Sequence, residues 1–489
     1  MGVARVACAS TLALLTTPAP ADGSTAAALT RPAGALTPPV PARPLRVSWM
    51  AGFRAPGTPT RYDRVGVIKV GAASARNVLV LEPGTSAGAA YFVPFAKWLV
   101  AKLPSWQVWA VERRENLLED QSVLKLAKEG GASAAQVFDY YLGYLTNPRI
   151  THHFRGVPAS TVGFAKGWGM KVAVADLRRV IEAARRLGGK VVLGGHSLGG
   201  AVVTAYATWD FAGHPGADQL AGLVYDDGGS SPSAVSASKA REELRALDSP
   251  DATPWLAFGG IPAPFAGLFN ATGSLGVLMD PNGPSLGQAF PLLPADLKPS
   301  VPVTNEAQYG YALNAATSPP TLLAAQAHLG RGISARTVNG YHTWDGAGAL
   351  TPIRRFAAMF AGAGILNADG TEWYFPQRLT DDTGAVGDGI ANPAQRVLDV
   401  RATMGRRLPR RLRIYAICTV LGGSRVLLAA RALAAQSHIP AGNLVLVNRR
   451  STYSHNDPAG AYPRNAFLTT LIPFLKRIAG PPSGPSGRR

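Results

Sequence analysis

The feature that constrains this chain most is a glycine-rich turn at residues 194–200, which reads Gly-Gly-His-Ser-Leu-Gly-Gly. The turn contains the pattern G-x-S-x-G with Ser197 at its centre, and it joins an apolar stretch at 190–194 to a helical pattern at 198–209. A serine on so sharp a turn takes strained backbone angles, and side chains two residues away on either side would collide with the turn. Glycine at 195 and 199 removes those side chains. The context therefore predicts a buried strand, a sharp turn that presents Ser197, and a helix.

Strand and helix patterns alternate on both sides of this turn. Apolar strand patterns occupy residues 65–70, 77–82, 107–111, 190–194, 220–225, 412–417 and 444–447. Helical patterns occupy residues 92–103, 169–187, 198–209, 425–436 and 464–478. Because the strands are continuously apolar rather than alternating, we expect an α/β fold with a mostly parallel central sheet and helices on both faces.

Composition and the rhythm of these patterns divide the 489-residue chain into segments. With 47% hydrophobic residues, the chain can bury a large core. The alternation of strands and helices lapses between residues 236 and 370, which we interpret as an inserted cap or lid rather than a separate domain. The predicted segments are a signal peptide (1–21), a flexible linker (22–48), the first part of the core (49–235), the cap (236–370), the second part of the core (371–480) and a disordered tail (481–489).

The first 21 residues have the features of an export signal. Arg5 supplies a positive charge, residues 6–15 are apolar, and Ala19-Pro20-Ala21 offers small residues for cleavage. We therefore expect a secreted, periplasmic or cell-envelope protein, with a cytoplasmic leader as the alternative. Removal of the signal leaves Cys418 as the one cysteine, so no intrachain disulfide is expected. Beyond the signal we find no apolar run of ~20 residues, so no transmembrane span is expected.

Basic residues outnumber acidic ones, 49 to 30, for a formal net charge of +19. This charge favours contact with an anionic envelope surface, and cations scattered over a solvated surface are the simpler alternative. The sequence has no zinc-finger spacing or RNA-binding motif, so we expect no nucleic-acid partner. The pair His152-His153 lacks a third ligand at suitable spacing, and we expect no metal and no cofactor. The densest basic patch consists of Arg406, Arg407, Arg410 and Arg411.

Together with the order of the elements around it, the turn at Ser197 resembles the nucleophile turn of the α/β-hydrolase superfamily, in particular its serine esterases and lipases. The resemblance covers most of residues 60–480 at the level of motif order. It implies an α/β-hydrolase fold in which Ser197 is the nucleophile and the acid and the histidine follow later in the chain. His455 lies between the strand at 444–447 and the last helix, so the resemblance implies that it is the general base. His438 precedes that strand and would lie at the opposite end of the sheet.

The acid is harder to assign, because residues 400–456 contain no Asp and no Glu. The family most often carries its acid after the penultimate strand, but some lipases carry it after the strand that follows the nucleophile helix. In this chain that earlier strand ends in Asp226 and Asp227, and adjacent strand residues face opposite sides, so one of the two can reach the imidazole. We favour Asp227, with Asp226 as the alternative and Asp399 and Asp457 as the remaining candidates.

The loop at residues 83–88, which follows the strand at 77–82, consists of small residues that allow a substrate carbonyl to approach closely. The resemblance implies that this loop supplies an oxyanion donor. We expect the backbone N–H of Thr85 or Ser86 to act together with that of Leu198; an ordinary turn is the alternative. The mixed-charge run at 112–120 is interpreted as a salt-bridged structural loop near the cleft.

These residues together predict a secreted serine hydrolase that cleaves a small-molecule or lipid-like carboxylic ester. Ser197 would form the acyl-enzyme, His455 would move the proton, and Asp227 would orient the imidazole. The apolar cap would supply the acyl pocket. Two alternatives stay open: an extracellular acyltransferase on the same scaffold, and a non-catalytic binding protein with a hydrolase fold.

Overall fold

The computed structural model of this protein describes residues 45–231, 233–362 and 364–480. The predicted signal peptide, most of the predicted linker and the predicted tail at 481–489 lie outside the described residues and stay predictions. The first strand, β1, begins at Val47, within the last residues of the segment predicted as linker.

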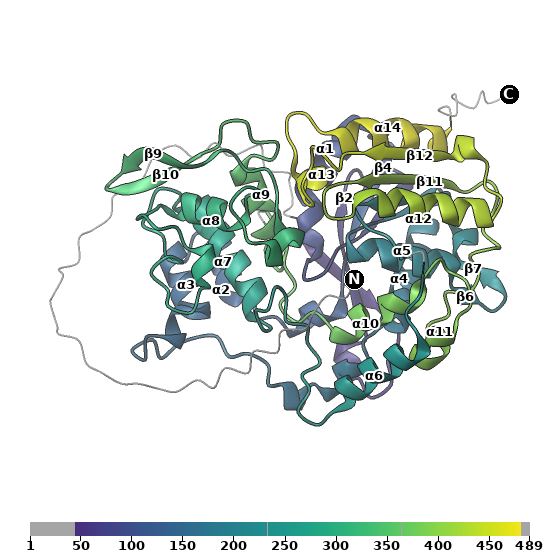
Figure 1. Cartoon of the computed structure of the whole chain (residues 1–489), viewed down its shortest axis with the longest axis horizontal. Coiled ribbons are helices and arrows are strands. Elements are labelled where there is room, and N and C mark those ends of the chain that lie inside the picture. The colour runs from purple at the N-terminus through teal and green to yellow at the C-terminus, as the bar shows by residue number, and fades with distance from the viewer. Residues whose placement is uncertain (1–44, 232, 363, 481–489) are drawn as a thin grey trace. The chain divides into compact units, whose positions relative to one another are not determined.

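An eight-stranded sheet forms the centre of the described residues, in the order β1-β2-β4-β3-β5-β8-β11-β12 (Figure 1). Strands β1 and β2 pair antiparallel, and β2 pairs antiparallel with β4. From β4 to β12 every neighbouring pair is parallel. The strands are β1 (Val47–Ala51), β2 (Arg64–Val70), β3 (Asn77–Glu82), β4 (Trp106–Glu112), β5 (Val191–His196), β8 (Gly222–Asp226), β11 (Arg413–Cys418) and β12 (Leu444–Asn448).

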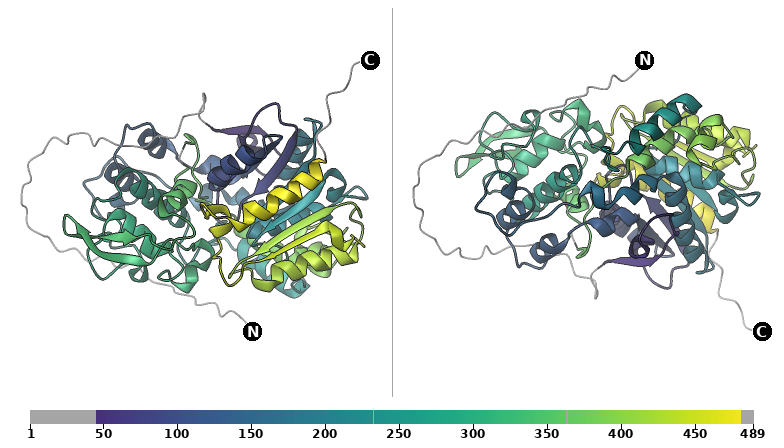
Figure 2. Two further views of the ribbon diagram at one scale, coloured as in Figure 1. Left: turned by 90° about the horizontal axis from the view of Figure 1, so that it is seen from above. Right: turned by 90° about the horizontal axis from the view of Figure 1, so that it is seen from below.

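Helices cover both faces of this sheet, which explains why its strands are apolar along their whole length. On β3, Val78 and Val80 belong to the core on one face, whereas Leu79 and Leu81 belong to the core on the other, as the two-residue period of a strand requires. The first face is covered by α4 (Met170–Arg185), α5 (Leu198–Thr208) and α12 (Gly423–Gln436), and the second by α1 (Val93–Lys102) and α14 (Ala466–Ala479). Figure 2 shows α14 in yellow and α12 in yellow-green on opposite sides of the strands. The predicted fold class is confirmed.

A second lobe lies beside the carboxyl ends of the parallel strands (Figures 1 and 2). It combines two stretches that are far apart in the sequence, because Leu124, Val137 and Tyr141 share one apolar core with Leu268 and Leu275. Its elements are α2 (Ser122–Lys128), α3 (Ala134–Tyr141), α7 (Phe265–Met279), α8 (Asn305–Leu313), β9 (Gly332–Val338), β10 (Tyr341–Asp345) and α9 (Ile353–Phe360).

The remaining elements pack mainly against neighbouring helices. Helix α6 (Ala237–Asp248) begins inside the segment predicted as cap. It packs against α10 (Gln377–Val386) and α11 (Pro393–Leu398) rather than against the second lobe. The boundaries predicted for the cap stay a prediction. These elements are β6 (Asp210–Phe211), β7 (His214–Pro215), α6 (Ala237–Asp248), α10 (Gln377–Val386), α11 (Pro393–Leu398) and α13 (Asp457–Gly460). None of the helices in the described part of the chain is long and apolar enough to cross a membrane.

The carboxyl group of Glu112, at the end of β4, gives the fold a pH dependence that can be measured. It is 1% exposed and accepts the N–H of Ala89 at 2.5 Å, and burial raises its pKa from 4.5 to about 8. The folded state holds this proton more tightly than the unfolded state. The contribution of Glu112 to the free energy of unfolding is therefore fully present below about pH 4.5 and is lost as the pH rises to about 8.

We predict that Glu112→Gln flattens the fall in the free energy of unfolding over this window, by up to ~1.4 kcal/mol per pH unit. Chemical denaturation between pH 4 and pH 9 measures the slope, with the exposed Glu129→Gln as the matched control. Equal slopes in the two variants would contradict the prediction.

Candidate active site

Ser197 lies at the tip of the turn between β5 and α5, with backbone angles φ 55° and ψ −125°. A non-glycine residue with positive φ costs of order 1–3 kcal/mol, so the surroundings must hold it in place. The Ser197 N–H donates to the carbonyl of Asp226 at 3.0 Å, and the N–H of Gly200 donates to the Ser197 carbonyl at 2.9 Å. A Cβ added at Gly195 would lie 2.3 Å from the Gly199 backbone, and one at Gly199 would lie 2.3 Å from the carbonyl oxygen of Glu82. The turn therefore requires glycine where the sequence analysis placed it.

His455 and Asp227 meet at the carboxyl ends of the parallel strands. The Nδ1 atom of His455, on the loop after β12, lies 2.6 Å from Oδ2 of Asp227, which follows β8. The two residues are 1% and 3% exposed. With Nδ1–H donating to the carboxylate, Nε2 of His455 is left as an acceptor, and it has no hydrogen-bond partner among the described residues. His455 and Ser197 line the same two cavities, so the structure brings the three predicted residues to one site.

Asp227 is held as a carboxylate by donors from the loop after β11. Thr419 donates both its backbone N–H, at 2.6 Å, and its hydroxyl, and the N–H of Gly422 donates at 3.3 Å. Burial raises the pKa of Asp227, but the hydrogen bonds from His455 and Thr419 outweigh burial and lower it below 3.8. This loop is where the sequence analysis sought an acid and found none. It supplies the donors for the acid instead.

The other candidate acids, Asp226, Asp399 and Asp457, make no hydrogen bond to the ring of His455 among the described residues. Asp226 is 1% exposed, its carboxyl oxygens have no hydrogen-bond partner among the described residues, and burial together with the charge of Asp227 raises its pKa well above its ordinary value. Asp399 pairs with Lys171 on the surface. Asp457 accepts the N–H of Ser454 at 2.7 Å and so braces the loop that carries His455.

His196 directly precedes Ser197, and its ring contacts that of His455. The two imidazole rings are 4.3 Å apart between centroids, and Nε2 of His196 lies 3.1 Å from the carbonyl oxygen of His455. Burial, with the neighbouring His455 adding to it, lowers the pKa of His196 to about 3, so its ring is neutral and can donate Nε2–H to that carbonyl. The ring of Tyr91 stacks on that of His196, with 5.0 Å between the ring centroids. No sequence signal distinguishes this role from ordinary packing.

The loop at residues 83–88 lies against Ser197, because a Cβ added at Gly84 would be 2.8 Å from the Ser197 Cβ. The backbone N–H groups of Thr85, Ser86 and Leu198 have no acceptor among the described residues. Leu198 is the first residue of α5, so its N–H also belongs to the positive end of the helix. N–H groups without an acceptor among the described residues thus occur in both backbone segments that adjoin Ser197.

Three cavities adjoin Ser197 or continue from it. The largest has a volume of about 380 Å³ and is lined by Ser197, Asp227, His455 and Arg425. A smaller one of about 40 Å³ is lined by Thr85, Ser86, Ser197 and His455. The third, of about 130 Å³ and mainly apolar, lies in the second lobe and shares Phe258, Asn270 and Ala325 with the smaller one. Ser197 and His455 thus line two cavities, and the smaller of these shares lining residues with the apolar cavity of the second lobe.

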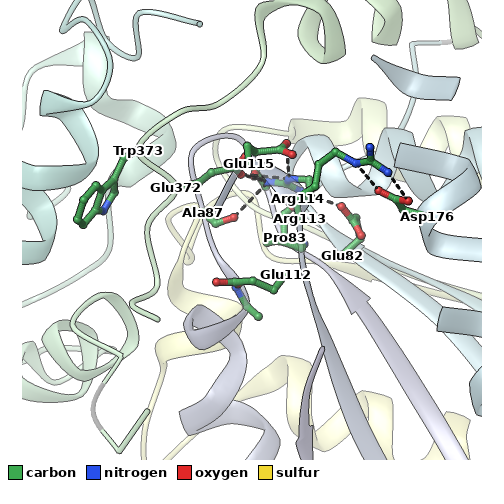
Figure 3. Close-up of polar contacts among 12 residues, drawn as sticks. Glu82, Pro83, Ala87, Glu112, Arg113, Arg114, Glu115, Asp176, Glu372 and Trp373 are labelled. Atoms are coloured by element: carbon green, nitrogen blue, oxygen red, sulfur yellow. Dashed lines mark hydrogen bonds and ion pairs between the residues drawn. The ribbon is translucent and has the colours of Figure 1, made fainter. Parts of the chain in front are cut away.

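The mixed-charge run after β4 forms buried ion pairs, as predicted for a salt-bridged loop (Figure 3). Arg113 pairs with Glu82 at 2.8 Å and with Glu372 at 2.6 Å. Arg114 pairs with Asp63 and Asp176. The described residues contain no group of three or more His, Cys, Asp or Glu side chains arranged to hold a metal ion, and His152 is exposed.

No protein-family model matches the sequence, and no curated protein matches it. Among solved structures, a candidate lipase from Sulfolobus solfataricus shares 13% identity over 88% of this chain and 91% of its own, with a TM-score of 0.43. A thermophilic esterase from Thermogutta terrifontis shares 12% identity over 89% and 100%, with a TM-score of 0.37. A soluble variant of monoglyceride lipase from Saccharomyces cerevisiae shares 10% identity over 90% and 98%, with a TM-score of 0.36.

The strand order of the sheet, its parallel pairing from β4 onward and the positive-φ turn at Ser197 define an α/β-hydrolase fold. The predicted resemblance to that superfamily is confirmed at the level of the fold. The roles of Ser197, His455 and Asp227 stay predictions.

The two adjacent acids give a direct test of the site. We predict that Asp227→Asn lowers kcat by ~10⁴-fold, because the amide removes the carboxylate that fixes the tautomer of His455. Asp226→Asn should cause a far smaller loss and should raise the free energy of unfolding at neutral pH, because ionisation of the buried carboxyl opposes folding as the pH rises above 3.8. Kinetics on a nitrophenyl ester and denaturation at pH 7 measure both effects, and equal or reversed kinetic losses would refute the assignment of Asp227.

Proposed function

We propose that this protein is a serine hydrolase that cleaves carboxylic esters. The observation that carries the proposal is the buried contact of 2.6 Å between Asp227 and Nδ1 of His455, in a site where the opposite ring nitrogen is unpartnered among the described residues and Ser197 lines the same cavities. A histidine held in this tautomer can accept the proton of a neighbouring serine hydroxyl.

The reaction follows from this geometry. The hydroxyl oxygen of Ser197 attacks the ester carbonyl while Nε2 of His455 takes the hydroxyl proton, and Asp227 stabilises the imidazolium that forms. The oxyanion accepts hydrogen bonds from the N–H of Leu198 and from that of Thr85 or Ser86. As the tetrahedral intermediate collapses, the carbon–oxygen bond to the alcohol breaks and His455 gives its proton to the departing oxygen. Water then attacks the acyl-enzyme by the same route and releases the acid.

The cavities support an ester with a lipophilic acyl group. The apolar cavity in the second lobe shares the lining residues Phe258, Asn270 and Ala325 with the smaller cavity beside Ser197, so an acyl chain bound across the two would place its carbonyl beside Ser197. The larger cavity, of about 380 Å³, is also lined by Ser197 and has room for the alcohol. We further propose that the protein acts outside the cytoplasm, where the exposed arginines at 406, 407, 410 and 411 can contact an anionic envelope surface.

Labelling with a fluorophosphonate probe tests the nucleophile. We expect the wild-type protein to be labelled at Ser197, and Ser197→Ala to abolish labelling, because the probe reacts with a serine activated by a neighbouring base. Ser238→Ala, a change at an exposed serine outside the site, is the control and should label like the wild type. Labelling that survives Ser197→Ala would refute the assignment, and absence of labelling in the wild type would favour a non-catalytic protein.

The proposed acyl pocket is tested by a substitution at a residue that lines both the apolar cavity and the smaller cavity beside Ser197. We predict that Ala325→Phe lowers kcat/KM on nitrophenyl octanoate relative to nitrophenyl acetate by ~10-fold or more, since loss of contact for several methylenes is worth 1–3 kcal/mol. The same substitution at the exposed Ala347 should leave the ratio unchanged. An unchanged ratio in Ala325→Phe would contradict the acyl pocket. Products formed with added alcohol would separate an acyltransferase from a hydrolase.

A further inference from the structure

Arg113 is a buried arginine whose hydrogen bonds converge on the loop at residues 83–88 (Figure 3). Its side chain is 5% exposed. One terminal nitrogen donates to the carbonyl of Pro83 at 3.0 Å, and the other donates to the carbonyls of Gly84 at 2.7 Å and Ala87 at 3.1 Å. The remaining donors bind Glu82 and Glu372, so the guanidinium is fully used.

The contact with Gly84 determines where a neighbouring N–H points. In a planar trans peptide the C=O of one residue and the N–H of the next point in opposite directions. Because Arg113 holds the Gly84 carbonyl on its own side of the loop, the Thr85 N–H is directed to the other side. Thr85 has no acceptor for this N–H among the described residues, and it lines the cavity that contains Ser197.

The same arginine links this loop to a strand-like segment that lies far away in the sequence. Glu372, which binds the guanidinium, also donates its own backbone N–H to the Ser86 carbonyl at 3.0 Å, and the N–H of Gly88 donates to Gly370 at 3.0 Å. Burial, together with the neighbouring Glu372, raises the pKa of Glu115 well above its ordinary value. The loop at residues 83–88 is therefore held by the guanidinium of Arg113 and by the backbone of Glu372, and the Glu372 side chain in turn binds Arg113.

Arg114 provides the contrast within the same chain. It is as deeply buried as Arg113, with a side chain 2% exposed, and it also pairs with two carboxylates, Asp63 and Asp176. Its one backbone acceptor is the carbonyl of Phe53, and it makes no hydrogen bond to the loop at 83–88 among the described residues. The two adjacent arginines thus differ in contact with the loop rather than in burial or pairing.

We infer that Arg113 is a positioning residue for catalysis: it orients the Gly84–Thr85 peptide so that the Thr85 N–H, rather than that of Ser86, is the oxyanion donor opposite Leu198. This inference rests on the proposed ester hydrolase function. Arg113 itself does not touch the reacting atoms. It acts through the peptide that it holds, and donors held in advance stabilise a developing negative charge most effectively.

The first test compares Arg113→Gln and Arg113→Lys with Arg114→Gln. We expect both Arg113 variants to lose ~10²–10³-fold in kcat with little change in KM, as for loss of one oxyanion donor. Lysine restores the charge but not the planar set of donors, so it should not restore kcat. The affinity for a trifluoromethyl ketone, whose adduct carries the oxyanion, should fall in parallel. Arg114→Gln should lower the free energy of unfolding and leave kcat and inhibitor affinity unchanged.

The second test does not depend on the folding of an arginine variant. Incorporation of the α-hydroxy analogue of threonine at position 85 replaces the Gly84–Thr85 amide by an ester and removes that N–H alone. We expect a loss in kcat of ~10²–10³-fold, a loss at least ten times smaller for the corresponding change at Ser86, and little further loss when Arg113→Lys is added to the Thr85 ester.

A larger loss for the Ser86 ester, normal kcat in the Thr85 ester, or equal kinetic effects of the Arg113 and Arg114 variants would overturn the inference. These outcomes are distinct from failure of the proposed function, which would appear as no ester turnover and no labelling of Ser197 in the wild-type protein.

Discussion

The close approach of backbone segments around Ser197 is the constraint on which the rest of the site depends. Strands β3, β5 and β8 are neighbours and parallel, so the turns that follow them meet at one edge of the sheet. Contact there is so tight that a Cβ at Gly228 would lie 1.9 Å from the Ser197 carbonyl oxygen, and one at Gly84 would lie 2.8 Å from the Ser197 Cβ. The strained conformation of the serine, the acid after β8 and the loop after β3 are therefore consequences of one packing arrangement.

The buried charged groups Asp227 and Arg113 at this edge of the sheet each have hydrogen-bonding partners, because an unpaired buried charge is costly. Asp227 is surrounded by donors from His455 and Thr419, and its pKa is lowered in spite of burial. Arg113 is surrounded by carboxyl groups and by carbonyls of the loop that it holds. Both groups are buried, and their hydrogen bonds keep polar atoms in fixed directions. Asp226 is the exception, because its carboxyl oxygens have no partner among the described residues, and burial raises its pKa well above its ordinary value.

The local sequence was sufficient to predict the strands and helices whose patterns lie within a few consecutive residues. The pattern around Ser197 predicts a strand, turn and helix, and these occur as Val191–His196, Ser197 and Leu198–Thr208. The continuously apolar strands predict a sheet covered on both faces, which the structure contains. No local pattern predicts that Leu124 and Tyr141 share an apolar core with Leu268 and Leu275, because these partners lie more than a hundred residues away.

The sequence by itself determined which residues can do chemistry: a serine flanked by glycines, a late histidine, and a pair of adjacent acids with no carboxylate in the usual later loop. Tertiary structure decided which of them meet and what surrounds them. The pairing of β8 with β11 brings Thr419 to Asp227, and Arg113 reaches a loop about thirty positions earlier and a glutamate 259 positions later. Hydrogen bonds depend on distance and direction in space, and chain order alone specifies neither for residues so far apart.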